Sequence, residues 1–229
     1  MERLKVLVAC EFSGIVRDAF RAQGHEAWSV DLLPTESDPT YHIQADINLV
    51  LNYPNRVLGG MPLWMRNVEW DLMIAHPPCT HLAVSGARHF KNKQTEQAEA
   101  LDFVRLLLNA PIPRIALENP VSVISSQIRK PTQTIQPWQF GHGEVKATCL
   151  WLKNLPRLIP TQYVEGREPR VHFMAPGPER WRERSRTLPG IAEAMATQWG
   201  ALPSRVDAPA RAFVPDQASN IFAQIVENS

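Results

Sequence analysis

The chain has 229 residues, a length that fits one main domain with a small appendage. Its 24 Lys and Arg against 23 Asp and Glu give a net charge of +1, which excludes a polyacidic tail or a histone-like polycation. A hydrophobic content of 44% excludes wholesale disorder, and 20 prolines predict many rigid loops.

Cysteine usage and hydropathy indicate the cellular compartment. No stretch approaches the ~20 apolar residues of a membrane span, and the first residues run into a strand without a signal-peptide pattern. The three cysteines, Cys10, Cys79 and Cys149, are odd in number and far apart, so they make neither a disulfide framework nor a metal knuckle. We expect a cytoplasmic, reduced protein with no membrane partner and no metal ion, and we favour a monomer.

Charge is uneven along the chain. Residues 121–229 carry 13 basic and 9 acidic side chains, whereas residues 1–120 carry 11 and 14. The second half alternates Arg with aromatic residues in RLIPTQYVEGREPRVHF and ERWRERSR. Arg suits phosphates and aromatic rings suit bases, so the mixture is typical of a nucleic-acid surface; an ordinary solvated surface explains it equally well.

Strands and helices alternate through the first half of the chain. Apolar runs predict strands over residues 4–9, 26–31, 41–47, 71–75 and 114–117. A helix follows the first strand, with Ser13 as its N-cap and Gly24 as its C′ residue. A second helix is predicted over residues 94–109, with Ala98, Leu101, Val104 and Leu108 facing inward. Repeated strand–helix–strand units indicate an α/β fold with a mostly parallel sheet.

The alternation weakens after residue 120. Residues 136–140 and 148–152 are predicted to form two antiparallel strands at the sheet edge, and residues 191–199 a last helix. We expect a catalytic and cofactor-binding core over 1–152, an Arg- and Pro-rich insert over 153–187, a helix returning to the core over 188–202, and a loosely packed tail over 203–229.

Polar or reactive residues follow all five predicted strands. Ligands of open parallel sheets bind outside the carboxyl ends of the strands, so these tips form the candidate site. The tips are Cys10 to Gly14, Asp31, Asp46, His76 to Cys79, and Glu118 to Pro120.

The first two tips favour a nucleoside ligand. Gly14 lets the backbone approach a ligand, and the carboxylate of Asp31 suits a ribose diol, although a turn residue at a strand end is the plainer reading of Asp31. A dinucleotide site needs Gly-x-Gly-x-x-Gly, and only one glycine is present here. A nucleoside without a pyrophosphate, such as S-adenosylmethionine, therefore fits better.

Cys79 and Glu118 are the candidate reactive pair. Two prolines place the Cys79 thiol at the end of the fourth strand, and Glu118 ends the neighbouring apolar strand, where a carboxylate needs a partner or a shifted pKa. The structural alternatives are a small buried cysteine and an acid that caps a helix over residues 120–127. A nucleophilic thiol beside an acid is the pair that adds to an electron-poor ring and protonates it.

These residues resemble the DNA cytosine-5 methyltransferases in kind and order, through Phe12-x-Gly14, Pro78-Cys79 and Glu118-Asn119. The phrases HPPCTHL, IQPWQFGHGEVKATCLWLKNLP and RSRTLPGIAEAM resemble in particular compact methyltransferase-like proteins of bacteriophages and prophages. The resemblance extends to about residue 200. It implies a Rossmann-like class I S-adenosylmethionine-dependent methyltransferase fold, with helices on both faces of the sheet, in a bacterial or phage-infected cell.

The resemblance also implies roles for single residues. Cys79 adds to carbon 6 of a cytosine flipped out of DNA, Glu118 holds the ring, and carbon 5 takes the methyl group from S-adenosylmethionine. Lys146 and Thr148 complete the catalytic set. The cofactor-binding residues are Phe12, Ser13, Gly14, Asp31, Asp46, Ile47, Pro77 and Ser185. The nucleic-acid-binding residues are His81, Ser85, Arg88, Lys91, Lys93, Arg170, Arg182 and Arg184, the first five from a loop over 80–93 that resembles the family's mobile catalytic loop.

The sequence departs from the family pattern in several places. Val16 stands where a second glycine is usual, and Pro120 stands where valine is usual. Of the family's Gln-x-Arg-x-Arg, Lys146 keeps one positive charge, and Thr148 replaces an arginine that normally supports the catalytic Glu. Only residues 153–187 stand in place of a target-recognition domain, which predicts low or short sequence specificity.

Three alternatives compete with DNA methylation. In the first alternative, the substrate is a free cytidine nucleotide or a single-stranded nucleic acid. In the second, the protein is a non-catalytic cofactor- or DNA-binding protein. Retention of both Cys79 and Glu118 is evidence against the second. The third, an amino-methyltransferase, needs an aromatic residue after Pro-Pro, where this chain has Cys79.

Overall fold

The computed structural model describes residues 2–52, 68–86, 93–175, 177 and 180–204. Their strands form one sheet in the order β3-β2-β1-β4-β5-β7-β6. The strands are β1 (Lys5–Ala9), β2 (Glu26–Asp31), β3 (His42–Gln44), β4 (Leu72–Ala75), β5 (Arg114–Pro120), β6 (Gln133–Ile135) and β7 (Thr148–Lys153).

The first five strands pair in parallel, in the order β3-β2-β1-β4-β5 of Rossmann-like sheets. β7 pairs antiparallel with both β5 and β6. The expected mostly parallel α/β sheet is therefore confirmed.

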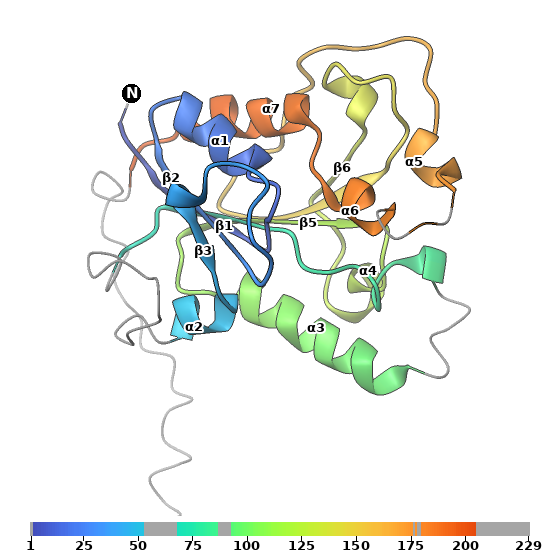
Figure 1. The fold of residues 1–229 in the computed structure, drawn as a ribbon, viewed down its shortest axis with the longest axis horizontal. Coiled ribbons are helices and arrows are strands. Elements are labelled where there is room, and N and C mark those ends of the chain that lie inside the picture. The colour runs from blue at the N-terminus through green and yellow to red at the C-terminus, as the bar shows by residue number, and fades with distance from the viewer. Residues whose placement is uncertain (1, 53–67, 87–92, 176, 178–179, 205–229) are drawn as a thin grey trace, which may run out of the picture.

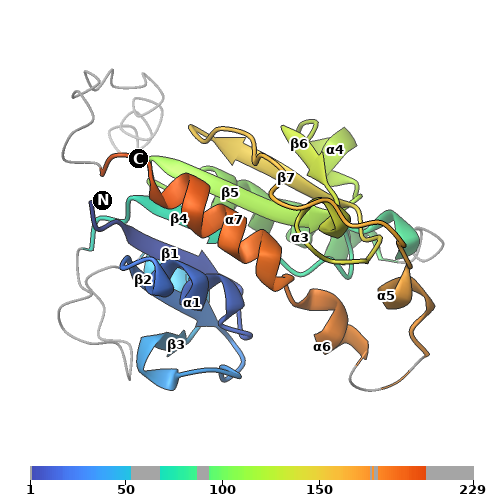
Figure 2. The same cartoon turned by 90° about the horizontal axis from the view of Figure 1, so that it is seen from above.

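Helices cover both faces of the sheet (Figures 1 and 2). Helices α1 (Ile15–Ala22) and α7 (Pro189–Gly200) pack together on one face. Helices α2 (Ile47–Asn52), α3 (Gln94–Leu108) and α4 (Ile124–Gln127) lie on the other. Two short helices, α5 (Arg170–Phe173) and α6 (Arg180–Ser185), precede α7. No helix of these residues is long and apolar enough to cross a membrane.

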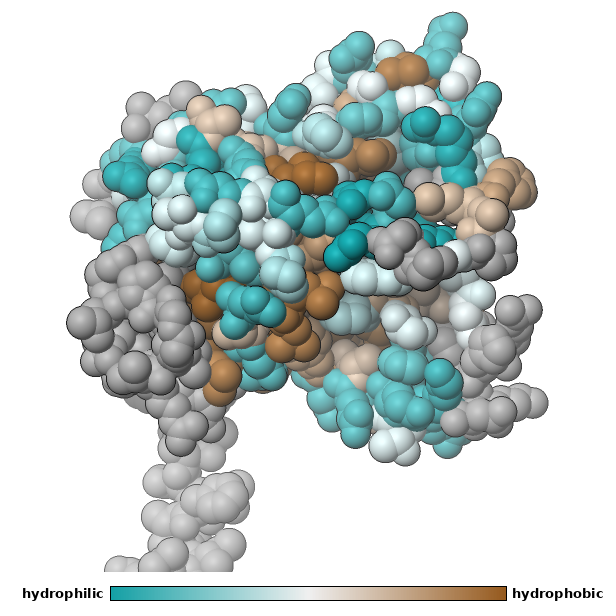
Figure 3. Space-filling model, in the orientation of Figure 1, coloured by the Kyte–Doolittle hydropathy of each residue, from teal (hydrophilic) through white to brown (hydrophobic). Residues whose placement is uncertain are grey.

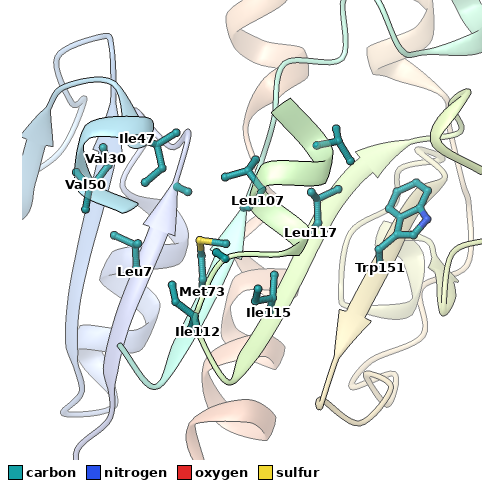
Figure 4. Close-up of a cluster of buried hydrophobic side chains, with 14 of the residues drawn as sticks. Leu7, Val30, Ile47, Val50, Met73, Leu107, Ile112, Ile115, Leu117 and Trp151 are labelled. Atoms are coloured by element: carbon teal, nitrogen blue, oxygen red, sulfur yellow. The ribbon is translucent and has the colours of Figure 1, made fainter. Parts of the chain in front are cut away.

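The alternation of side chains along each strand creates two hydrophobic cores. The core under α2 and α3 contains Leu7, Met73, Ile115, Leu117 and Trp151 (Figure 4). The core under α1 and α7 takes the intervening strand residues, among them Leu72, Ile74, Ala116 and Leu150. Each such fully buried aliphatic side chain contributes about 1.5–3 kcal/mol, so burial on both faces holds the central strands in register.

Two predicted strands are wrong at their boundaries. β3 ends at Gln44 instead of residue 47, because Asp46 accepts a hydrogen bond from the Asn48 N–H (2.9 Å) and starts α2. The strand predicted over 136–140 lies at β6, and residues 137–139 form a 3-10 turn that begins at Pro137. The expected pair of antiparallel strands at the sheet edge is confirmed: β7 lies beside β5, and β6 is the outermost strand.

The last two predicted helices lie where they were expected, and the buried residues of the first differ in part from the prediction. In α3, Leu101, Val104 and Leu107 are buried, whereas Ala98 is exposed and Leu108 is only partly buried. In α7, the predicted inward residues Ile191, Ala194, Met195 and Trp199 are all buried. The predicted tail lies almost wholly outside the described residues, which end at Ser204.

The N-terminus of α1 is capped differently from the prediction. Gly14 is the N-cap residue, at φ 76°, and its place in the chain leaves Ser13 outside the helix. The carboxylate of Glu11 accepts from the Val16 N–H at 2.6 Å and the Arg17 N–H at 3.2 Å. Glu11 thus satisfies two of the open donors of the first turn and places a negative charge at the positive end of the helix. Gly24 follows the helix at φ 87°, as predicted.

We expect Gly14→Ala to destabilise the fold more than Gly24→Ala. Both glycines have positive φ, which costs an L-residue about 1–2 kcal/mol. A Cβ on Gly14 also comes within 2.8 Å of the Ser37 Cβ and 2.7 Å of an Arg17 guanidinium nitrogen, whereas Gly24 has nothing within 4 Å. Chemical denaturation of the two variants measures the difference, and equal losses of unfolding free energy would contradict the crowding at Gly14.

Candidate active site

The strand tips of β1 and β4 meet beneath the segment that follows α6. They enclose a small cavity of about 40 Å³, lined by Cys10, Glu11, Phe12, Ser13, His76, Ser185 and Thr187. This is the edge of the sheet that the sequence indicated, because the carboxyl ends of parallel strands meet there. The surface seen in Figure 3 is largely hydrophilic, with hydrophobic residues gathered near its centre.

Glu118 lies within β5 and faces His76. The parallel register pairs Ala75 with Leu117, so the next residues, His76 and Glu118, stand side by side. The His76 Nδ1 is 3.4 Å from the Glu118 Oε2, and their side chains are 8% and 15% exposed. Burial alone raises the pKa of the Glu118 carboxyl, but the contact with His76 and the charge of Lys146 outweigh it and lower that pKa.

The turn that carries Cys79 is tied to the same strand. The Asn119 Nδ2 donates to the Pro77 carbonyl at 2.9 Å, and Asn119 is fully buried. The carbonyl of Cys79 accepts from the N–H groups of Leu82 and Ala83 at 3.0 and 2.9 Å. Successive residues of β5 therefore hold the acid and fix the thiol-bearing turn.

The Cys79 thiol is half-buried and shares an electrostatic environment with Glu118. Burial raises its pKa, and the nearby Glu118 carboxylate raises it further. Arg184 and Lys146 act in the opposite direction, and the net effect is a raised pKa. The structure thus brings Cys79, Glu118 and Lys146 into one charged cluster, together with Arg184, which sequence reasoning assigned to nucleic acid.

Lys146 and Thr148 take different positions in this cluster. The Lys146 Nζ donates to the carbonyls of Arg184 at 2.8 Å and Arg186 at 3.2 Å, at the end of α6. The Thr148 hydroxyl donates to the Lys146 carbonyl at 3.2 Å. The Thr148 hydroxyl therefore bonds the backbone of Lys146. The residue in contact with Glu118 is His76.

The predicted cofactor residues divide into two groups. Phe12, Ser13 and Ser185 line the cavity. Asp31 lies at the end of β2, where its carboxylate accepts from the Leu33 N–H at 2.9 Å and burial raises its pKa.

The other predicted cofactor residues make structural contacts at their positions. Gly14 is required by its positive φ and its close neighbours, and Pro77 is buried in the turn. Asp46 is exposed and caps α2, and Ile47 packs into the hydrophobic core beside Val30 (Figure 4). A cofactor contact at residues 46 and 47 stays a prediction.

The segment 180–187 covers the cavity. The Trp181 ring lies 5.7 Å from that of Phe12, and the Arg182 guanidinium 5.9 Å from the same Phe12 ring. Arg186 bonds both carboxylate oxygens of Glu36 at 2.8 Å, and this contact lowers the pKa of the Glu36 carboxyl. A bidentate ion pair thus joins the loop after β2 to the segment that covers the cavity.

The predicted nucleic-acid residues are dispersed. Ser85, Lys93 and Arg184 are exposed, His81 is half-buried, and Arg88 and Lys91 lie outside the described residues. Arg170 pairs with Glu144 at 3.3 Å, and Arg182 pairs with Glu36 at 3.4 Å. Within the described part of the chain, no group of three or more His, Cys, Asp or Glu side chains is arranged to hold a metal ion.

Sequence reasoning missed His76 and Glu11 as functional residues. His76 is the last residue before Pro-Pro-Cys, and the parallel register that places it beside Glu118 was a usable signal. Glu11 gave no comparable signal, because its contacts with Val16 and Arg17 depend on the path of the loop over 10–14.

Comparison with family models and with curated proteins finds no match. Among solved structures, the chain is similar to a protein described as a candidate DNA modification methyltransferase encoded within a prophage of E. coli. The two share 13% identity at a TM-score of 0.45, over 76% of this chain and 55% of that one. The chain thus spans about half the length of that protein, and a likeness at this level supports no conclusion about function.

We expect the pH profile of Cys79 alkylation to report its charged neighbours. The thiolate is the form that reacts, so removal of a cation moves the profile to higher pH and removal of the anion moves it to lower pH. Lys146→Gln and Arg184→Gln should therefore slow modification by iodoacetamide at pH 8, and Glu118→Gln should accelerate it. Mass spectrometry of the Cys79 peptide measures the rates.

Lys153→Gln is the control for this experiment, because it removes a cation from the far end of β7, where the Nζ bonds the Ala110 carbonyl. Its profile should match that of the unmodified sequence. A shift of the same direction in Lys153→Gln and Lys146→Gln would show that the effect is a general one of net charge.

Proposed function

We propose that this protein methylates carbon 5 of cytosine in DNA. The observation that carries the proposal is the cluster at the ends of β4 and β5, where a buried carboxylate in contact with His76 raises the pKa of a thiol on a Pro-Pro turn. Such a pair suits covalent addition to an electron-poor ring. A protein that only binds a ligand has no need of this arrangement.

The residues divide the reaction among them. The Cys79 thiolate forms a bond to carbon 6 of the cytosine while ring nitrogen 3 takes a proton from solvent, so the electron pair of the carbon 5–carbon 6 double bond moves toward that nitrogen. The ionised Glu118 accepts hydrogen bonds from the protonated nitrogen 3 and from the amino group. S-adenosylmethionine, when bound, supplies the methyl group that carbon 5 accepts. The proton of carbon 5 then passes to a solvent base, and the bond between Cys79 and carbon 6 breaks. Each reacting atom of the cytosine lies inside the stack of a duplex, so the base must be flipped out.

The described residues fit a nucleoside cofactor in their chemistry. The carboxylate of Glu11 already occupies the N-terminus of α1, the place where a phosphate would bind. A pyrophosphate is therefore disfavoured, and a positively charged ligand such as S-adenosylmethionine is compatible with this carboxylate. Phe12 and Ser13 line the cavity and Asp31 stands at the next strand end, as a nucleoside requires.

The cavity must open to admit such a ligand. Its volume of about 40 Å³ is far below the ~300–1,000 Å³ of ordinary ligand pockets. Ser185 and Thr187 form one wall, and the Glu36–Arg186 ion pair holds their segment in place. Loss of this ion pair alone removes about 0–1 kcal/mol from the closed state, and the Lys146 hydrogen bonds and the Phe12–Trp181 contact also hold the segment.

We expect Glu36→Gln to accelerate cofactor association by up to about fivefold. The ion pair contributes at most about 1 kcal/mol, so its loss raises the fraction of molecules in which the segment is open by no more than that factor. Stopped-flow fluorescence of Trp181, which contacts Phe12, measures the association rate. Asp38→Asn is the control, because Asp38 lies in the same loop and its carboxylate accepts from the Thr40 N–H. Equal rates in all three proteins would show that the ion pair does not limit entry.

A nucleic-acid substrate agrees with the surface around the cluster. Arg184 and Lys93 are exposed cations that phosphates can contact. Leu32, Val84, Val121 and Trp181 are 45–70% exposed and lie next to the strand tips or their loops, so apolar surface is available to an unstacked base. The segment 153–187 contributes α6 to the cavity cover, which leaves little of it to read a sequence, and we expect short or relaxed specificity.

Transfer of a tritiated methyl group from S-adenosylmethionine tests the proposal. Duplex DNA, single-stranded DNA and free cytidine nucleotides serve as parallel substrates, with Cys79→Ser as the control variant and nucleoside analysis of the product. We expect 5-methylcytosine in DNA and at least a thousandfold loss in Cys79→Ser, as when a catalytic nucleophile is removed.

Two other outcomes decide between the alternatives. Label only in nucleotides would assign the activity to a nucleotide precursor. No label in any substrate, with S-adenosylmethionine still bound by calorimetry, would refute the enzyme and favour a cofactor-binding protein.

A further inference from the structure

His76 has one ring nitrogen with a partner and one without. Its side chain is 8% exposed, its Nδ1 faces Glu118, and its Nε2 is buried with no hydrogen-bond partner among the described residues. A buried polar atom without a partner is destabilising, and a ligand atom that bonds it recovers that loss. His76 also lines the cavity between the strand tips and the segment 185–187.

The charge of Glu118 fixes the role of each nitrogen. Contact with His76 and the charge of Lys146 keep the pKa of the Glu118 carboxyl low, so the carboxylate is ionised and only accepts hydrogen bonds. The Nδ1 of His76 must therefore carry the hydrogen that faces Glu118. In the neutral ring, the Nε2 is then an acceptor, which selects a donor group on the ligand.

The surroundings of the Nε2 favour a positively charged donor. Glu11, fully buried beside the same cavity, interacts electrostatically with His76. Burial raises the pKa of the Glu11 carboxyl, and cationic groups near it act in the opposite direction. An ammonium group between these residues would donate to the Nε2 and stabilise the Glu11 carboxylate.

We propose that His76 is a positioning residue that joins the two halves of the site: its Nδ1 orients Glu118 toward the cytosine, and its Nε2 receives the ammonium group of S-adenosylmethionine. This inference rests on the proposed function and adds a residue to it. One imidazole ring thus contacts the groups that hold both substrates, so cofactor binding and the orientation of Glu118 depend on each other.

Two substitutions separate the two contacts. In His76→Asn the amide reaches the position of the Nδ1 and keeps the contact with Glu118, whereas in His76→Gln the amide reaches the position of the Nε2. We expect His76→Asn to weaken S-adenosylmethionine about three- to tenfold by calorimetry, and His76→Gln to change it by less than about twofold. Thermal unfolding of both variants checks that they fold.

The ligand group is identified with 5′-methylthioadenosine, which keeps the nucleoside and the sulfur and lacks the ammonium group. Its affinity should be the same in the unsubstituted protein and in His76→Asn. If His76→Asn weakened the binding of 5′-methylthioadenosine as much as that of S-adenosylmethionine, the Nε2 would contact the nucleoside. The ammonium assignment would then be overturned.

The Glu118 contact has a readout that needs no catalysis. Carbon-13 NMR of the Glu118 carboxyl should show a larger rise in pKa in His76→Gln than in His76→Asn, because only the latter keeps a donor at the Nδ1 position. Lys146, whose charge also acts on Glu118, is present in both variants. The same pKa in all three proteins would overturn the Glu118 half of the proposal.

Failure of this inference differs from failure of the proposed function. Active methyl transfer with identical affinities and identical Glu118 titration in both variants would refute the role of His76 and leave the enzyme intact. Cofactor binding and titration that follow the expected pattern, without methyl transfer to any substrate, would support His76 and refute the activity.

Discussion

The antiparallel pairing of β7 with β5 determines where the reactive groups lie. β4 pairs with β5 only as far as Leu117, but β7 continues the ladder through Glu118, Asn119 and Pro120. Within a strand, successive side chains point to opposite faces. Glu118 therefore turns to the face of His76, and Asn119 turns to the other, where it bonds the Pro77 carbonyl. Without β7, these residues would belong to a loop and neither contact would be fixed.

The same pairing explains why Glu118 acts on the ionisation of Cys79. A buried carboxylate is tolerated only with partners, and His76 and Lys146 keep Glu118 ionised. That negative charge raises the pKa of the Cys79 thiol. The free protein therefore holds a thiol of raised pKa beside an ionised acid. Under the proposed function, a base whose ring nitrogen has taken a proton would pair with Glu118 and neutralise its charge, so binding of the substrate itself would favour the thiolate.

Much of the fold could be predicted from the sequence, because the parallel strands are short apolar runs separated by turn residues. β1, β2, β4 and the start of β5 follow directly from this pattern. β3 was overextended because the apolar Ile47 continues the run, although Asp46 begins a helix. The internal place of β7 also had a signal: TCLWL is apolar at every position after Thr148, which is typical of a strand covered on both faces.

The candidate site was less predictable, for a reason visible in its residues. Cys79 and Glu118 stand out by residue type at strand ends, so composition and order were enough to single them out. The contacts of His76, Glu11 and Thr148 depend on register and loop path. A threonine in place of an arginine implied that Glu118 is supported more weakly or by a different arrangement, and the structure places His76, the residue after β4, in contact with Glu118. The comparison of motifs included His76 in HPPCTHL but gave it no role.

One helix links the cofactor cavity to the nucleic-acid side of the cluster. Segment 180–187 places Ser185 and Thr187 on the cavity wall, and the same segment carries Arg184 near Cys79. Lys146 bonds the carbonyls at the end of α6, where a cation is favourable. When this segment opens, Cys79 loses the influence of Arg184, one of the two cations that lower its pKa. With the cover in place, Arg184 offsets part of the rise in the Cys79 pKa that burial and Glu118 cause, so opening of the segment would make the thiolate harder to form.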